Sequence, residues 1–399
     1  MKWKSEYLSN FTIICELAEQ VRKGANHVTS PKPADAKEGY TDRMRSQESS
    51  LTWKIFVGLE AFVRAVSFVV CLLSERFSDV SVEESKFDLT KGVPAKLYRS
   101  RRRRFYRTAV IIHGISPSGY DDRRLVKLGK ALASCGYIVV FPDIVQFRQC
   151  KIGAESVDIV GRMVRLVCKR PDICTDGRVD AVSACVSASV CLLAAVDTEK
   201  IRSVLAFGAL ADAKEVWEYL KWSKHLDATY GRNVVFRNCW NPENDGLSEL
   251  LIAALADDHH HTAGIESTEL QSCMRKANER DISIYKRWKS DPRFRAISYK
   301  DIESSEKFLT GFGAISPVHK AHSTRCERVI LIHGADDGIV PASESLRLHN
   351  EYQSTRKIEV SCCITTLLEH GKLRTLGFGL LQELYTLLTS FAAFFRRYG

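Results

Sequence analysis

The apolar positions in the middle and C-terminal parts of the chain alternate between short strand-like runs and amphipathic helical stretches. Strand-like runs lie at Thr108–Ile112, Tyr137–Phe141, Arg178–Val182, Ser203–Phe207, Val329–Ile332 and Ile358–Thr365. Helical periodicity lies between them at Asp122–Ser134, Ser156–Cys168 and Ser187–Val196. Strands that alternate with helices are typical of a mostly parallel sheet flanked by helices, so we expect an α/β fold.

The strand signal fades between residues 213 and 312, where helical patterns take over. We therefore expect a helical, lid-like insertion there, above the sheet. The predicted organisation is an N-terminal helical extension over 1–80, the first part of the core over 81–212, the insertion over 213–312, and the second part of the core over 313–399.

The extension contains one amphipathic helical pattern at Tyr7–Val21, a polar linker, and then an apolar run at Leu51–Phe77. Glu60 and Arg64 interrupt this run and would form an ion pair on one helical face. Three placements remain open: packing on the protein, lying on a membrane surface, or spanning a bilayer. The two charges favour the first two, because a charge inside lipid is costly.

Composition is that of a soluble globular protein, with 45% hydrophobic and 27% charged residues. Lys and Arg number 58 against 48 for Asp and Glu, which gives a net charge of +10. Part of this excess is local, at Arg99, Arg101–Arg104 and Arg107. The block is either a solvated loop before a strand or a patch that contacts an anionic membrane surface, and we expect no specific nucleic-acid partner.

The chain has 13 scattered cysteines, with no CxxC pair of the kind that builds a zinc site. Together with an N-terminus that lacks a secretory pattern, this favours a reducing, cytoplasmic location, with peripheral membrane association through residues 51–77 as the alternative. The run Asp257–His261 is a weak metal candidate, because adjacent histidines on a helix point in different directions. No phosphate-binding loop or dinucleotide fingerprint occurs, and we expect neither a metal nor a cofactor.

The strongest chemical signal is the passage from the strand at Arg178–Val182 into the following helix. Ser183, Cys185 and Ser187 occupy the G-x-S-x-G positions of a nucleophile elbow, where small residues permit a sharp turn. Cys185 would sit at a helix N-terminus, where the dipole lowers the pKa of a thiol. Ser187 is an alternative nucleophile if the turn is shifted by two residues, and a buried structural cysteine is the competing interpretation.

Two further positions follow in the order that such a triad requires. Asp337 lies in a loop after the strand at Val329–Ile332, and His370 follows the strand at Ile358–Thr365. The chain order nucleophile, acid, histidine predicts that His370 takes the proton from Cys185 while Asp337 orients the imidazole.

The segment His113-Gly114-Ile115 follows the first clear strand, at the place where an oxyanion hole would be completed. We expect Gly114 and Ile115 to supply one side of this hole, with the backbone N–H groups of Ile115 and Val186 as its donors.

These motifs resemble the α/β-hydrolase superfamily over about residues 109–393, with an esterase-like branch as the nearest pattern. A cysteine at the nucleophile position is similar to that of dienelactone hydrolases and polyhydroxyalkanoate synthases. The resemblance implies hydrolysis of an ester, lactone or thioester through an acyl-cysteine, with a small-molecule acyl substrate. Serines replace both elbow glycines, which keeps two alternatives open: a catalytically inactive protein that binds a ligand or partner, and an acyltransferase.

Overall fold

The computed structural model describes residues 57–72, 82–101, 107–240, 245–258, 268–368 and 378–396. Several sequence predictions lie outside these residues: the helix at Tyr7–Val21, the linker that follows it, Arg102–Arg104, His259–His261 and His370.

The sheet has eight strands in the order β1-β2-β4-β3-β5-β6-β7-β8. Their bounds are β1 (Val82–Thr90), β2 (Val93–Ser100), β3 (Arg107–Ile112), β4 (Tyr137–Pro142), β5 (Val179–Ala184), β6 (Ile201–Phe207), β7 (Arg328–Gly334) and β8 (Glu359–Thr365). The pairs β1–β2 and β2–β4 are antiparallel, and all the other pairs are parallel. This order and direction, with a helix after most parallel strands, is the α/β-hydrolase fold, which confirms the expected fold class.

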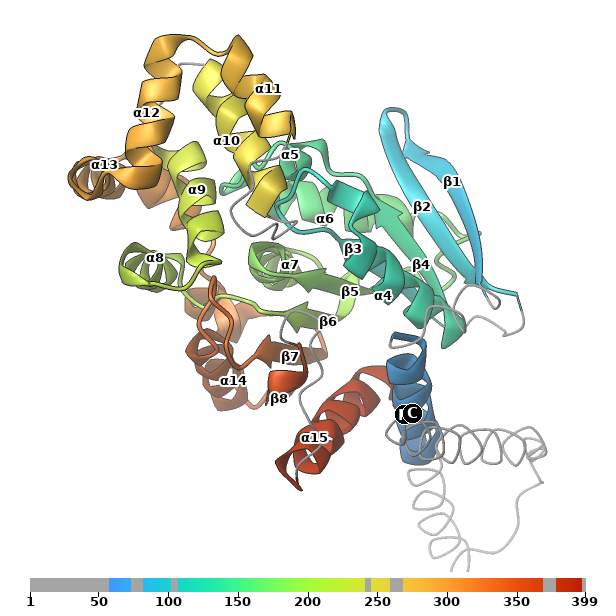
Figure 1. Ribbon diagram of the computed structural model, residues 1–399. Coiled ribbons are helices and arrows are strands. Elements are labelled where there is room, and N and C mark those ends of the chain that lie inside the picture. Colours follow the sequence, from blue (N-terminus) through green and yellow to red (C-terminus); the bar gives the residue numbers. More distant parts are fainter. Residues whose placement is uncertain are drawn as a thin grey trace, which may run out of the picture.

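Helices of the core connect the strands, and a second group lies between β6 and β7 (Figure 1). The core helices are α4 (Arg123–Ser134), α5 (Val145–Arg148), α6 (Glu155–Cys168), α7 (Val186–Asp197), α14 (Ser343–Ser354) and α15 (Phe378–Phe395). The insertion contains α8 (Ala213–Trp222), α9 (Ala228–Cys239), α10 (Asp245–Asp258), α11 (Thr268–Lys276), α12 (Glu279–Ser290), α13 (Pro292–Ser304) and the short η2 (Lys307–Phe312). There are also three short helical turns, η1 (Gly119–Asp121), η3 (Pro317–Ser323) and η4 (Thr366–Leu368).

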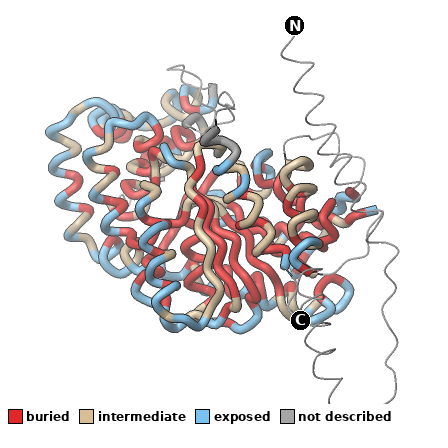
Figure 2. The backbone as a smooth tube through the Cα atoms, turned by 90° about the horizontal axis from the view of Figure 1, so that it is seen from below, coloured by how far each residue is buried: buried red, intermediate tan, exposed pale blue. Residues whose placement is uncertain are grey.

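The central strands are buried on both faces, as Figure 2 shows, and their side chains alternate between two apolar clusters. In β3, Val110 and Ile112 face the cluster that contains α6, α7 and α14, whereas Ala109 and Ile111 face the opposite cluster. The opposite cluster contains α4 and α15. The helices therefore form one layer on each side of the sheet.

A helix over residues 57–72 belongs to the same layer as α4 and α15. Its Phe68 is fully buried and meets the ring of Phe391 at 4.8 Å between centroids. The predicted ion pair forms, with Arg64 Nη2 2.8 Å from a Glu60 carboxylate oxygen. Of the three placements open from the sequence, this part of the run adopts packing on the protein. No helix in the described part of the chain has the length and apolarity to cross a membrane.

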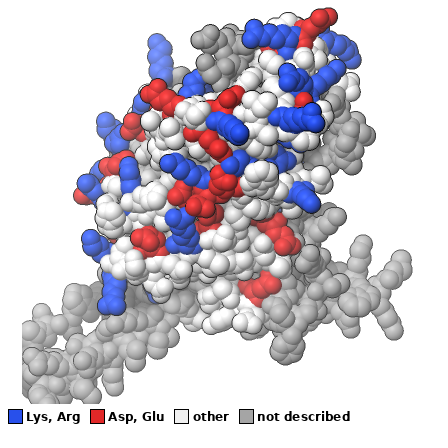
Figure 3. Space-filling model, turned by 90° about the vertical axis from the view of Figure 1, so that its left-hand side faces the viewer, with Lys and Arg blue, Asp and Glu red and all other residues white. Residues whose placement is uncertain are grey.

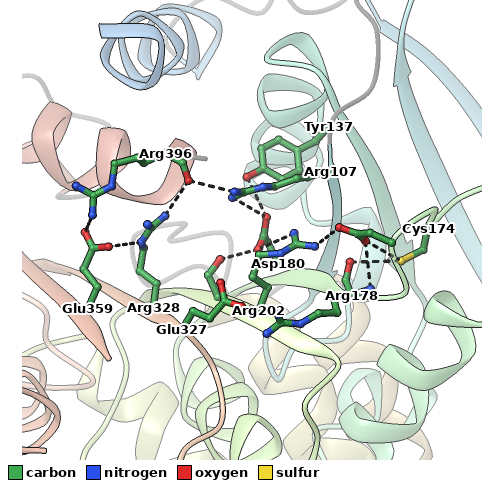
Figure 4. A network of polar contacts seen from close by, with 12 residues as sticks. Arg107, Tyr137, Cys174, Arg178, Asp180, Arg202, Glu327, Arg328, Glu359 and Arg396 are labelled. Atoms are coloured by element: carbon green, nitrogen blue, oxygen red, sulfur yellow. Dashed lines mark hydrogen bonds and ion pairs between the residues drawn. The ribbon is translucent and has the colours of Figure 1, made fainter. Parts of the chain in front are cut away.

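Charged side chains tie the parallel strands together at their amino ends (Figure 4). The buried Asp180 of β5 accepts hydrogen bonds from Tyr137 of β4 at 3.1 Å and from Ser203 of β6 at 2.8 Å. Arg107 and Arg202 approach the same carboxylate at 3.7 and 3.5 Å, respectively. This buried charge is thus paired and hydrogen-bonded, as its removal from water requires.

The same edge of the sheet holds the C-terminal end of α15. The backbone carbonyl of Arg396 accepts a hydrogen bond from Arg107 at 3.1 Å and one from Arg328 at 3.2 Å. Glu359 accepts a hydrogen bond from Arg328 at 2.9 Å and pairs with the Arg396 side chain (Figure 4). Two cations at a helix C-terminus stabilise its partial negative charge, so this contact fixes α15 on the sheet.

The arginine block that the sequence singled out is divided between elements. Arg99 lies in β2 and donates a hydrogen bond to the Asp172 carbonyl at 3.1 Å. Arg107 opens β3, and its guanidinium lies 3.7 Å from the Asp180 carboxylate. These two residues therefore have structural contacts within the protein. On the face in Figure 3, basic and acidic side chains are interspersed.

We expect Phe68→Ala to lower the free energy of unfolding by about 3–5 kcal/mol, because it empties a fully buried aromatic site between α15 and the sheet. The matched control is Leu59→Ala on the same helix, where the side chain is 51% exposed and the expected change is within about 0.5 kcal/mol. Urea denaturation measures both. Equal, small effects would contradict the docking of this helix on the core.

Candidate active site

The turn between β5 and α7 holds Cys185 in an unusual backbone conformation. Its φ is 59° and its ψ is −145°, a region that residues with a Cβ rarely occupy. The Cys185 amide donates a hydrogen bond to the Phe207 carbonyl at 2.7 Å, which continues the β5–β6 pairing past the end of the strand. Cys185 then becomes the N-cap of α7. A strained residue at a sharp strand-to-helix turn is the geometry of a nucleophile elbow.

The serines around Cys185 are directed into the protein. Ser183 donates to the Ile112 carbonyl at 2.8 Å, and Ser189 donates to the Leu210 carbonyl at 2.9 Å. Ser187 is fully buried in α7, and its hydroxyl is among the buried polar atoms of the described chain that have no hydrogen-bond partner. Cys185 retains partial exposure to solvent. Of these four residues, Cys185 is the one with intermediate burial, and the three serines are buried.

The Cys185 thiol does not have the lowered pKa that its place at a helix N-terminus led us to expect. Burial raises its pKa to about 11, and the negative charge of Asp337 acts in the same direction. The Val186 amide and the Arg124 guanidinium favour the thiolate, but their effect is smaller. Desolvation of the thiolate outweighs the helix dipole, so the group is a neutral thiol at pH 7.

Asp337 lies in the loop after β7, close to the turn that follows β6. Its Oδ1 accepts hydrogen bonds from the Ile339 and Val340 amides at 2.8 and 3.0 Å. A Cβ on Gly208 would lie 3.4 Å from Asp337 Oδ2, so the two residues are neighbours, and the φ of +60° at Gly208 favours glycine there. Gly208 directly follows Phe207, whose carbonyl accepts the hydrogen bond from the Cys185 amide. The loop that contains Asp337 and the turn at Cys185 therefore meet at the carboxyl ends of neighbouring strands.

His333, at the end of β7, holds the acid loop in shape. Its Nε2 donates to the Val340 carbonyl at 2.9 Å, and its Nδ1 accepts from the Ser345 hydroxyl at 2.6 Å. Nε2 is also 3.7 Å from Asp337 Oδ2. The ring is fully buried, and burial lowers its pKa, so His333 remains neutral and serves the backbone of the loop.

His113 orients the peptide between Gly114 and Ile115. The Ile144 amide donates to His113 Nε2 at 2.9 Å, which leaves the proton on Nδ1 to be donated to the Gly114 carbonyl, also at 2.9 Å. Burial lowers the pKa of His113 to about 4, so the ring stays neutral and Nε2 stays an acceptor. Because the Gly114 carbonyl and the Ile115 N–H belong to one trans peptide, fixing the carbonyl also fixes the direction of that N–H.

The loop after β3, which the sequence predicts to form one side of an oxyanion hole, approaches the turn at Cys185 closely. A Cβ on Gly114 would lie 4.0 Å from the Ala184 carbonyl oxygen, immediately before Cys185. Val186 is the first residue of α7, and its N–H therefore has no partner within the helix. This N–H favours the Cys185 thiolate and so acts to lower the pKa of the thiol. Gly114, Ile115, Val186 and Cys185 thus lie in one region.

The helical insertion contacts this region through α9 and the segment before it. Tyr230 of α9 donates a hydrogen bond to the Ile115 carbonyl. A Cβ on Gly338, beside Asp337, would overlap the ring of His225. At the far end of α9, Asn238 donates to the Cys150 carbonyl at 2.8 Å and accepts from the Ile152 amide at 2.9 Å. The insertion is therefore hydrogen-bonded to the core at both ends of α9.

The structure thus brings Cys185, Asp337, Gly114, Ile115 and Val186 to the carboxyl ends of the central strands. It places Ser187 inside α7, and His370 lies outside the described residues. The described residues contain no cluster of side chains suited to a metal ion.

Sequence reasoning did not assign roles to His113, His333, Tyr230 or Arg124. A signal was available for the two histidines, since each lies within one residue of the end of a strand and is followed by glycine, in His113-Gly114 and His333-Gly334. No comparable signal marks Tyr230, because its contact depends on where the insertion folds back.

No family model matches the sequence, and a search of curated proteins found no match. Among solved structures, the chain is similar to a puromycin-hydrolyzing peptidase of Mycobacterium tuberculosis, with a TM-score of 0.43 and 12% identity over 79% of this chain and 38% of the peptidase. It is also similar to an acylaminoacyl peptidase of Pyrococcus horikoshii, with a TM-score of 0.41 and 11% identity over 80% of this chain and 43% of that one.

A third similar structure is the 2-hydroxy-6-oxo-6-phenylhexa-2,4-dienoate hydrolase of Rhodococcus sp. strain RHA1, with a TM-score of 0.36 and 16% identity over 71% of this chain and 90% of that one. The match spans less than half the length of the two peptidases.

The strained backbone at Cys185 predicts that Cys185→Gly is more stable than Cys185→Ala. Glycine adopts the observed φ and ψ without strain, whereas alanine keeps the Cβ that makes them costly. Relief of the strain favours glycine, whereas the greater entropy of glycine in the unfolded chain opposes it. We expect the net difference in the free energy of unfolding to be about 1 kcal/mol in favour of Cys185→Gly. Parallel urea titrations of the two variants measure it, and an alanine variant that is the more stable would contradict the turn geometry.

The lowered pKa of His113 predicts that stability falls as the pH decreases from 6.5 towards 4. In this window the unfolded chain binds a proton at His113 that the folded protein does not bind, so the unfolded state gains stability. Above pH 6.5 the contribution of His113 is constant, and its full size is about 3 kcal/mol. Urea titrations at pH 7.5, 5.5 and 4.5 should show a smaller loss for His113→Asn than for the unaltered protein, and equal losses would refute this assignment.

Proposed function

We propose that this chain is a hydrolase that cleaves an ester, lactone or thioester through an acyl-Cys185 intermediate. The observation that carries the proposal is the conformation of Cys185, with φ 59° and ψ −145° at the N-terminus of α7. A fold seldom keeps such strain unless the side chain at the turn has a use. Partial exposure of Cys185, in contrast to the buried Ser187, supports the cysteine as the nucleophile.

In the proposed reaction, His370 removes the proton from the Cys185 thiol, and the sulfur attacks the acyl carbon. A base is needed because the thiol is neutral at pH 7. The tetrahedral intermediate collapses when the bond to the leaving group breaks and His370 returns the proton to that group. Water then attacks the thioester with His370 as base, which releases the acid and restores the thiol.

The negative oxygen of each tetrahedral intermediate would accept hydrogen bonds from the Ile115 and Val186 amides. Asp337 would orient His370 and stabilise its protonated form. The charge of Asp337 also raises the pKa of Cys185, so the cysteine would stay a neutral thiol until His370 removes its proton. The anchored insertion would cover an acyl group of the substrate, and an insertion that excludes water would favour acyl transfer to another acceptor.

We expect Cys185→Ala to reduce the turnover of p-nitrophenyl acetate and butyrate by roughly a thousandfold or more, because it removes the attacking atom. His370→Ala should have a comparable effect. Intact-protein mass spectrometry after brief mixing with substrate should detect an acyl adduct on the unaltered protein and none on Cys185→Ala.

Ser187→Ala is the matched control and should retain turnover, since the serine hydroxyl is buried and Cys185 is partly exposed. Loss of activity in Ser187→Ala with retention in Cys185→Ala would transfer the nucleophile to Ser187. The absence of turnover and adduct across ester and thioester substrates would favour a protein of this fold that binds a ligand without catalysis.

A further inference from the structure

The loop after β3 has three successive backbone carbonyls that are each hydrogen-bonded. The Gly114 carbonyl accepts from His113 Nδ1 at 2.9 Å, and the Ser116 carbonyl accepts from the Gly119 amide at 3.0 Å. Between them, the Ile115 carbonyl accepts from the Tyr230 hydroxyl. The first and third donors belong to the loop and its strand, whereas the second comes from α9 of the insertion.

We propose that Tyr230 is a positioning residue that couples the helical insertion to the oxyanion loop. Its hydrogen bond fixes the peptide between Ile115 and Ser116, and His113 fixes the peptide between Gly114 and Ile115. The Ile115 residue, whose N–H is the proposed oxyanion donor, is thus restrained on both sides. The catalytic part of this inference rests on the proposed function.

Packing around α9 restricts the movement of the tyrosine. Gly231, the next residue, would place a Cβ 2.7 Å from Leu220 and 3.3 Å from Ile339, so α9 lies close to both α8 and the acid loop. Asn238 holds the other end of the helix against residues 150–152. The Tyr230 hydroxyl therefore comes from a helix that is already fixed on the core.

Tyr230→Phe tests the inference because it removes only the hydroxyl. We expect hydrogen exchange of the backbone amides at residues 113–118 to accelerate about fivefold, as the loss of one hydrogen bond allows. We expect kcat for p-nitrophenyl butyrate to fall about tenfold with KM changed less than twofold, because a misdirected donor weakens binding of the transition state and not of the substrate. The matched control is Tyr219→Phe in α8, which makes the same chemical change on the insertion away from the loop and should alter neither quantity.

Hydrogen exchange tests whether Tyr230 anchors the loop, and kcat tests whether the anchor matters for catalysis. Unchanged exchange in Tyr230→Phe would overturn the anchor itself. Faster exchange with unchanged kcat would overturn the positioning role and leave Tyr230 as a structural contact. A lack of turnover in the unaltered protein would count against the proposed function and the catalytic part of this inference, while the exchange result would still decide whether Tyr230 anchors the loop.

Discussion

The hydrogen bond from the Cys185 amide to the Phe207 carbonyl, at 2.7 Å, is the contact on which the candidate site depends. It extends the β5–β6 pairing by one residue and so obliges the chain to turn sharply into α7 with a positive φ at Cys185. Without this restraint the strained turn would relax, since the conformation costs about 1–3 kcal/mol for a residue with a Cβ. The same turn brings the thiol to a place where the Val186 amide favours the thiolate and the charge of Asp337 opposes it.

Two neutral buried histidines perform parallel tasks around this turn. His113 donates a hydrogen bond to the Gly114 carbonyl in the loop after β3, and His333 donates one to the Val340 carbonyl in the loop that contains Asp337. Each ring stays neutral because burial lowers its pKa, and each therefore keeps one donor and one acceptor nitrogen with a defined partner. The loops that approach Cys185 are thus held by polar contacts from inside the protein, and α9 adds a further contact from outside through Tyr230.

The opposite edge of the sheet is held by charge. Asp180, together with the arginines at the starts of β3, β6 and β7, ties the amino ends of the strands to one another and to the end of α15. In turn α15 packs against the helix over residues 57–72 through Phe68 and Phe391. The sequence left open whether this apolar segment lies on a membrane. Over residues 57–72 it is part of the helical layer that covers the sheet.

The sequence by itself determined the parallel strands, their helices and the chain order of Cys185, Asp337 and His370, because periodicity and small-residue turns are local properties. It did not reveal the antiparallel strands β1 and β2, of which β1 has a charged, exposed edge with little apolar pattern, nor α15, which follows the last strand. It also suggested a lowered pKa for Cys185, since a helix N-terminus is visible in a sequence and the burial of a thiol is not. The placement of Tyr230 on the Ile115 carbonyl was decided by tertiary structure alone, because the two residues meet only when the insertion packs against the core.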